Sequence, residues 1–145
     1  MSEPLEQMEA VTRPWCGRSW EGLVDRRFAA STQAHALSQA TEQDAHQVVS
    51  RFLEFFNTTG LGLFRDEEEW IFRSLRPTPG VVLRAVEEHI EISSLITALV
   101  HDAEAGRADL SVIHGLGASL RGHLMFEELE IAPLVRDRPR LILTP

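Results

Sequence analysis

The amino-acid sequence predicts an all-α protein, an up-down-up-down four-helix bundle. Three observations lead to this prediction: apolar residues recur at steps of three and four, turn signals are few and widely spaced, and no segment shows the alternation typical of a half-buried strand. Long amphipathic helices joined by short breaks pack most simply as such a bundle. The helices are predicted near residues 22–40, 44–75, 80–104 and 109–135.

The first two helices follow an irregular segment. Residues 1–21 contain two of the seven prolines and little periodicity, so we expect an N-terminal arm there. The first helix has the weakest stripe of small and apolar residues, which consists of Leu23, Ala30, Ala34 and Leu37. After a soft break at residues 41–43, the second helix has a longer stripe: Val49, Leu53, Phe56, Gly60, Leu63, Glu67, Ile71 and Leu75.

The last two helices follow the strongest turn signal, the proline- and glycine-rich residues 76–80. The stripe of the third helix is Val82, Val86, His89, Ile92, Ile96 and Leu99. A break at residues 105–109 ends in Asp109, an expected N-cap for the fourth helix. The stripe of that helix is Ile113, Leu116, Leu120, His123, Glu127 and Ile131. The bundle is therefore predicted over residues 22–138, with a C-terminal tail at 139–145.

Composition narrows the class of protein. The chain has 145 residues, 43% of them hydrophobic and 25% charged, which suits one globular domain. Its formal net charge of −8 argues against nucleic acid or an anionic membrane as a partner. The single cysteine, Cys16, excludes a disulfide framework and a cysteine-rich zinc module. Because no membrane span or signal peptide is recognisable, we expect a cytoplasmic protein.

Four polar residues occupy positions on the apolar stripes: Glu67, His89, His123 and Glu127. A buried carboxylate without a partner is costly, so these groups should pair with one another or with a metal ion. His123 and Glu127 are four residues apart and project from one helix face, where both side chains can reach one ion. Imidazole and carboxylate ligands without thiolate suit iron, manganese or zinc. The alternative is a metal-free core of hydrogen-bonded histidine and glutamate.

The second and fourth helices also resemble each other. With an offset of 60 residues, the sequence from Leu63 to Glu68 aligns with that from His123 to Glu128, and Ile71 aligns with Ile131. Both segments fit the pattern H-x-x-x-E-E-x-x-I, except that Leu63 replaces the histidine in the first copy.

These motifs resemble those of the hemerythrin-like (HHE cation-binding) family of four-helix bundles, over roughly residues 28–136. The strongest similarity lies in residues 86–92 and 123–133. Residues 52–56 and 64–69 resemble the second-helix motif of that family, and residues 34–37 resemble the end of its first-helix histidine signature. The resemblance implies a hemerythrin-like fold and a site for a bridged pair of non-haem irons.

The resemblance further implies which residues bind the metal. The matching positions are His35, Glu67, His89, His123 and Glu127, with Glu128 as a competitor for the last role. Leu63 stands where a histidine is expected, and Ala34 fits the first-helix stripe better than His35. His46 is only 17 positions before Leu63, which leaves too little helix for it to reach the site, so it belongs near the opposite end of the bundle.

We therefore expect at most one non-haem iron per chain. We also expect the protein to act as a sensor or storage module for iron or O2. The alternative is a metal-free bundle that acts as an interaction or ligand-binding scaffold. An enzyme is the weaker interpretation, because no acid–base pair or substrate motif is recognisable. A metal ion is the expected partner, and a homodimer is compatible with the sequence.

Overall fold

The computed structural model describes residues 20–75 and 78–137, and within these ranges the chain is helical, with no strand. The first helix, α2 (Val24–Ser38), follows a short 3₁₀ turn, η1 (Glu21–Leu23). The second runs through four contiguous elements: α3 (Ala45–Phe55), η2 (Phe56–Gly60), α4 (Leu61–Asp66) and η3 (Glu67–Phe72). The third is α5 (Pro79–Glu104), and the fourth comprises α6 (Leu110–Phe126), η4 (Glu127–Ile131) and α7 (Ala132–Asp137). All four predicted helices are confirmed.

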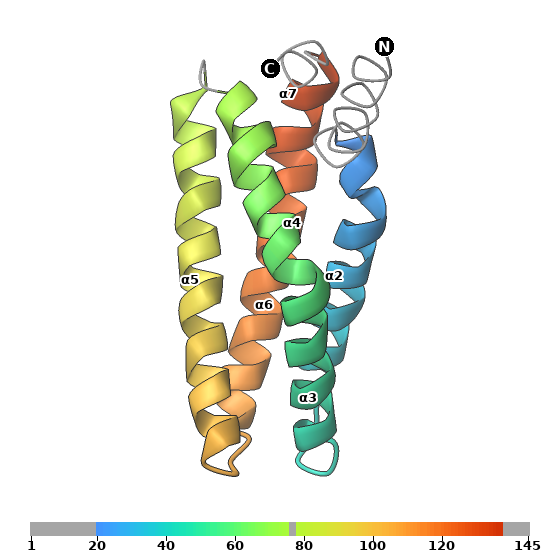
Figure 1. The fold of residues 1–145 in the computed structure, drawn as a ribbon, viewed down its shortest axis with the longest axis vertical. Coiled ribbons are helices and arrows are strands. Elements are labelled where there is room, and N and C mark those ends of the chain that lie inside the picture. Colours follow the sequence, from blue (N-terminus) through green and yellow to red (C-terminus); the bar gives the residue numbers. More distant parts are fainter. Residues whose placement is uncertain (1–19, 76–77, 138–145) are drawn as a thin grey trace, which may run out of the picture.

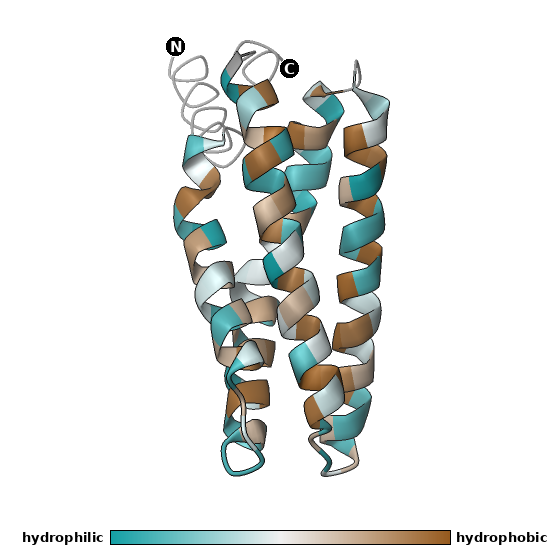
Figure 2. Cartoon of the chain, turned by 180° about the vertical axis from the view of Figure 1, so that it is seen from behind, coloured by the Kyte–Doolittle hydropathy of each residue, from teal (hydrophilic) through white to brown (hydrophobic). Residues whose placement is uncertain are grey.

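The four helices lie side by side along one common axis (Figure 1). The most extensive packing joins α6 to α2 and to α5, and α3 contacts α2 and α5. The connections at residues 39–44 and 105–109 lie at the same end of the bundle (Figure 1). Hydrophilic residues dominate these connections, whereas hydrophobic and hydrophilic residues alternate along each helix (Figure 2).

The ends of the helices follow local sequence signals. Pro79 begins α5, where its missing N–H leaves no bond unmade. Gly106, with φ of 73°, lies just after the end of α5 in a conformation that glycine adopts without strain. The predicted N-cap is confirmed, because the Asp109 carboxylate accepts a hydrogen bond of 2.9 Å from the backbone N–H of Ser111.

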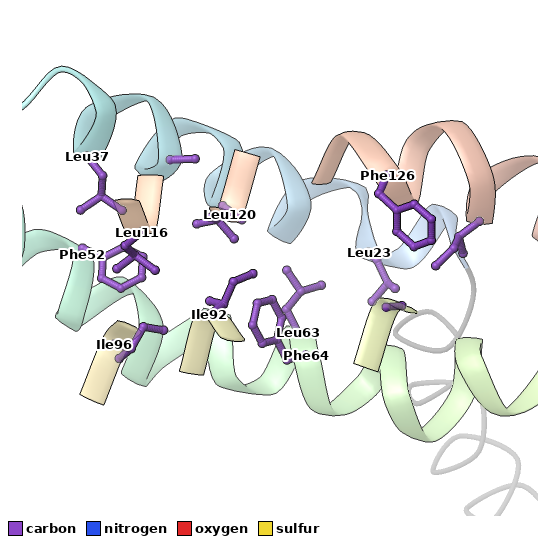
Figure 3. Packing of buried hydrophobic residues seen from close by; sticks show 14 of the residues in the cluster. Leu23, Leu37, Phe52, Leu63, Phe64, Ile92, Ile96, Leu116, Leu120 and Phe126 are labelled. Atoms are coloured by element: carbon purple, nitrogen blue, oxygen red, sulfur yellow. The ribbon is translucent and has the colours of Figure 1, made fainter. Parts of the chain in front are cut away.

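The core follows the predicted stripes closely. Leu37, Leu63, Ile92 and Leu116 are among its fully buried side chains, and Figure 3 shows labelled side chains from different helices meeting between the ribbons. Burial of such side chains provides the main stabilisation of a helical bundle.

Trp20 is the exception to the predicted boundary of the arm. It is 3% exposed and belongs to the core, and the Arg27 guanidinium lies over its ring, 4.3 Å from the ring centroid. The rest of the predicted arm up to residue 19, which includes Cys16, and the predicted tail at 139–145 lie outside the described residues. Within the described ranges, no helix is both long and apolar enough to cross a membrane.

The α2–α6 contact depends on a glycine, and this gives a testable prediction. A Cβ atom at Gly117 would lie 2.7 Å from Ser38 Oγ and 2.9 Å from the Ser38 backbone nitrogen, whereas one at Gly115 would meet nothing within 4 Å. We expect Gly117→Ala to lower the free energy of unfolding by about 1–3 kcal/mol. The control, Gly115→Ala, should raise it by up to about 1 kcal/mol through helix propensity. Thermal and urea denaturation measure both changes, and equal effects would contradict the packing argument.

Candidate metal centre

Four polar side chains are buried together in the bundle: Glu67, His89, His123 and Glu127. Their exposed fractions are 0%, 2%, 1% and 0%, respectively. Each offers a ligand atom, a ring nitrogen or a carboxylate oxygen, and these four atoms lie within 4.8 Å of one another. The structure thus brings together four of the five residues that the sequence singled out.

The two carboxylates occupy equivalent positions in the repeated segments. Glu67 is the first residue of the π-helical turn η3, and Glu127 is the first residue of the π-helical turn η4. Four positions on, Ile71 and Ile131 are both fully buried. Single π-helical turns inside α-helices often mark functional sites. The 60-residue offset therefore extends to the local backbone, which the residue pattern alone did not predict.

The facing atoms of the cluster are close but not hydrogen-bonded. His89 Nε2 lies 3.3 Å from Glu67 Oε1, and His123 Nε2 lies 3.3 Å from Glu127 Oε2. Among the described residues, none of these four atoms has a hydrogen-bond partner. Buried polar atoms are costly without a partner. Two nitrogens and two oxygens directed toward one another are, however, the donor set that a transition metal accepts, so the residues present fit a metal ion.

The other ring nitrogen of each histidine is held by a glutamate. His89 Nδ1 lies 2.6 Å from Glu68 Oε2, and His123 Nδ1 lies 2.8 Å from Glu88 Oε1. A carboxylate can only accept a hydrogen bond, so each Nδ1 carries the hydrogen and each Nε2 presents its lone pair to the cluster. Phe64 fixes one ring further, since it stacks on His89 at 3.9 Å between centroids. The histidines are thus oriented as metal-binding histidines usually are.

Burial and mutual contact change the pKa values of the cluster. Burial, and then the adjacent Glu127, raise the pKa of Glu67 well above its usual value. Burial also acts to raise the pKa of Glu127, but the adjacent Glu67 and His123 groups and the charge of Arg27 lower it to about 2. Ionisation of Glu127 is therefore favoured and ionisation of Glu67 is disfavoured, and a bound cation would favour the ionised form of both carboxylates.

The pKa values of the two histidines are shifted in opposite directions. Burial, and then the charge of His123, lower the pKa of His89. Burial acts to lower the pKa of His123 too, but the adjacent carboxylate of Glu127 and the hydrogen-bonded carboxylate of Glu88 outweigh it and raise that pKa. His89 is thus the imidazole more readily available as a neutral ligand.

Arg27 is a member of the site that the sequence reasoning missed. Its side chain is 12% exposed and lies against the carboxylates of Glu67, Glu127 and Glu128. A signal was present, because Arg27 falls on the first-helix stripe between Leu23 and Ala30. An arginine on an apolar stripe is ordinarily explained by a buried stem and a solvated head, and here the head is buried as well.

The remaining candidates lie elsewhere. His35 is exposed while the adjacent Ala34 is buried, so the first helix directs an alanine and not the histidine to the interior. Leu63 is fully buried in the core. The Glu128 side chain is 52% exposed and pairs with Arg27 and Arg136, so Glu127 is the carboxylate of this pair that joins the cluster. His46 is exposed and lies near the start of α3, away from the cluster.

The fold and the cluster together define a helical bundle with a buried carboxylate–histidine site that can hold a metal. The sequence matches the family described as hemerythrin HHE cation binding domain over residues 26–135. This match covers more than half of the chain, and the chain belongs to that family. No curated protein and no solved structure matches the chain significantly.

Proposed function

We propose that this protein is a mononuclear non-haem iron module that stores or senses iron or O2. Glu67, His89, His123 and Glu127 would hold the ion, which would supply a redox-active centre and open coordination positions for a small ligand. The observation that carries the proposal is the set of four buried, facing ligand atoms, which find no hydrogen-bond partner within residues 20–75 and 78–137. Two imidazoles and two carboxylates without sulfur favour iron, with manganese and zinc as competitors.

A surface recess beside His89 supports this function. A surface recess of about 270 Å³ is lined in part by His89, Glu68 and Ser93. His89 therefore lies between the buried cluster and a solvent-filled hollow, while Phe64 and Phe72 cover other sides of its ring. The four ligand residues are at most 2% exposed, so the buried cluster offers no room for a large substrate, which favours sensing or storage over catalysis on an organic molecule.

We also propose that the bundle has the up-down-up-down course. The placement of both connections, at residues 39–44 and 105–109, at one end supports it (Figure 1). In that course the repeated segments of the second and fourth helices run in the same direction. This brings Glu67 and Glu127 to the same level, as a shared metal site requires.

Metal analysis tests the proposed function. The full chain is purified from cells supplied with iron and manganese, its metal content is determined, and the metal-free protein is titrated with Fe²⁺ under anaerobic conditions. We expect one iron per chain and an absorption change on exposure to air. A protein that neither retains nor binds any metal would contradict the proposal and favour the metal-free scaffold. Retention of zinc alone would remove the redox role.

A further inference from the structure

Arg27 lies beside the oxygens of Glu67 and Glu127 that do not face the histidines. Glu67 directs Oε1 toward His89, while its Oε2 lies 3.9 Å from Arg27 Nε. Glu127 directs Oε2 toward His123, while its Oε1 lies 3.4 Å from the Arg27 Nη2 atom. The carboxylate pair is thus placed between two imidazoles on one side and a guanidinium on the other.

Several contacts hold the guanidinium in this position. Its Nη2 donates a hydrogen bond of 3.1 Å to the carbonyl oxygen of Leu124, and its Nη1 lies 3.4 Å from Glu128 Oε2. The Trp20 ring covers one face of it. Three carboxylates therefore surround one fixed positive charge. An arrangement of this kind would also suit a hard divalent cation, which prefers oxygen ligands.

The repeated segments show the same relation twice. Glu68 and Glu128 are equivalent in the 60-residue offset, and each directly follows one of the buried carboxylates. Glu68 pairs with His89, which faces Glu67, and Glu128 pairs with Arg27, which faces Glu127. Arg27 therefore has, beside Glu127 and Glu128, the place that the His89 imidazole has beside Glu67 and Glu68.

We propose that Arg27 is a built-in cation that takes the place of a second metal ion at the carboxylate pair and so limits the site to one metal. This inference rests on the proposed function of the cluster. A guanidinium brings positive charge to Glu67 and Glu127 without any metal, and it repels a divalent cation that approaches the same oxygens. Arg27 also lines a surface groove of about 690 Å³ that α2 shares with the fourth helix, so its position is reachable from solvent once the side chain is shortened.

The test is a Mn²⁺ titration of metal-free protein by calorimetry and native mass spectrometry. The variant Arg27→Gln leaves Glu67 Oε2 and Glu127 Oε1 without their cation and leaves Glu128 paired with Arg136 alone. We therefore expect a second Mn²⁺ per chain, bound on the order of tenfold or more weakly than the first. Arg27→Lys keeps a positive charge there and should bind one. The matched control is Arg26→Gln, because Arg26 is the neighbouring arginine and its partly buried side chain pairs with Asp66 at 2.9 Å. It should also bind one.

Each outcome decides between the proposals. One Mn²⁺ in both the wild type and Arg27→Gln would overturn the role of Arg27 and leave the metal module standing. Two Mn²⁺ ions bound to the wild type would also overturn the role of Arg27 and leave the metal module standing. No Mn²⁺ and no Fe²⁺ in any protein would overturn both. Should Arg27→Gln fold only when Mn²⁺ is added, with two ions bound, the metal replaces the guanidinium as proposed; failure to fold even with Mn²⁺ would refute the replacement.

Discussion

Tight metal binding is lost when His123 is replaced by leucine: we expect His123→Leu to lower the affinity for Fe²⁺ by at least about 100-fold. The loss should exceed the roughly 10–100-fold that follows removal of a group behind a ligand, because His123 supplies a ligand atom itself. Leucine is the residue that the chain already has at the equivalent position 63, where it is fully buried. The fold should therefore accept it, although metal-free stability should fall by on the order of 3 kcal/mol, because Glu127 and Glu88 lose a partner.

Two further variants make this result interpretable. His35→Leu removes the first-helix histidine that the family resemblance proposed as a ligand but that is exposed here, and we expect it to bind Fe²⁺ like the wild type. Glu127→Gln keeps the shape of a ligand and removes its charge, so it should lose metal and also lower stability, by on the order of 3 kcal/mol, because Arg27 and His123 lose their partner. Wild-type affinity in His123→Leu, or loss of affinity in His35→Leu, would contradict the assigned site.

The sequence predicts the bundle well because the hydrophobic periodicity is long and rarely interrupted. Leu23, Ala30, Ala34 and Leu37 form the least convincing stripe, and all four are buried. The same periodicity identified the polar cluster, since a histidine or glutamate on an apolar stripe stands out against its neighbours. It also separated Ala34 from His35, because adjacent residues on a helix point about 100° apart.

The rest of the site depends on contacts between helices, which the hydrophobic periodicity of a single helix does not predict. Trp20 lies before the periodic pattern begins, yet it is buried in the core and its ring lies against Arg27, a residue of the first helix. Glu127, and not Glu128, continues the fourth-helix stripe four residues after His123, and Glu127 is the buried one of the two. No residue type announces the π-helical turn that starts at Glu127. Arg27 was on the stripe, but its role depends on three carboxylates from other helices, which only the packing brings to it.

A second metal should appear when Leu63→His is combined with Arg27→Gln. Residue 63 precedes Glu67 by four positions, as His123 precedes Glu127, so an imidazole at 63 can approach Glu67 from the helix that carries it. In Leu63→His alone, the guanidinium still faces Glu67 Oε2 and Glu127 Oε1, and we expect one metal per chain. The single variant should also lose about 1–3 kcal/mol of metal-free stability, because it buries a polar ring in a position made for leucine.

The double variant should bind two Fe²⁺ or Mn²⁺ ions per chain, with the second held at least about tenfold more tightly than in Arg27→Gln, because an imidazole joins the carboxylates there. Titrating the wild type, both single variants and the double variant forms a cycle that measures the coupling between the two positions. Additive effects would mean that residues 27 and 63 act on separate parts of the bundle. Two metals in Leu63→His alone would show that a missing imidazole, and not the guanidinium, is what limits the site to one ion.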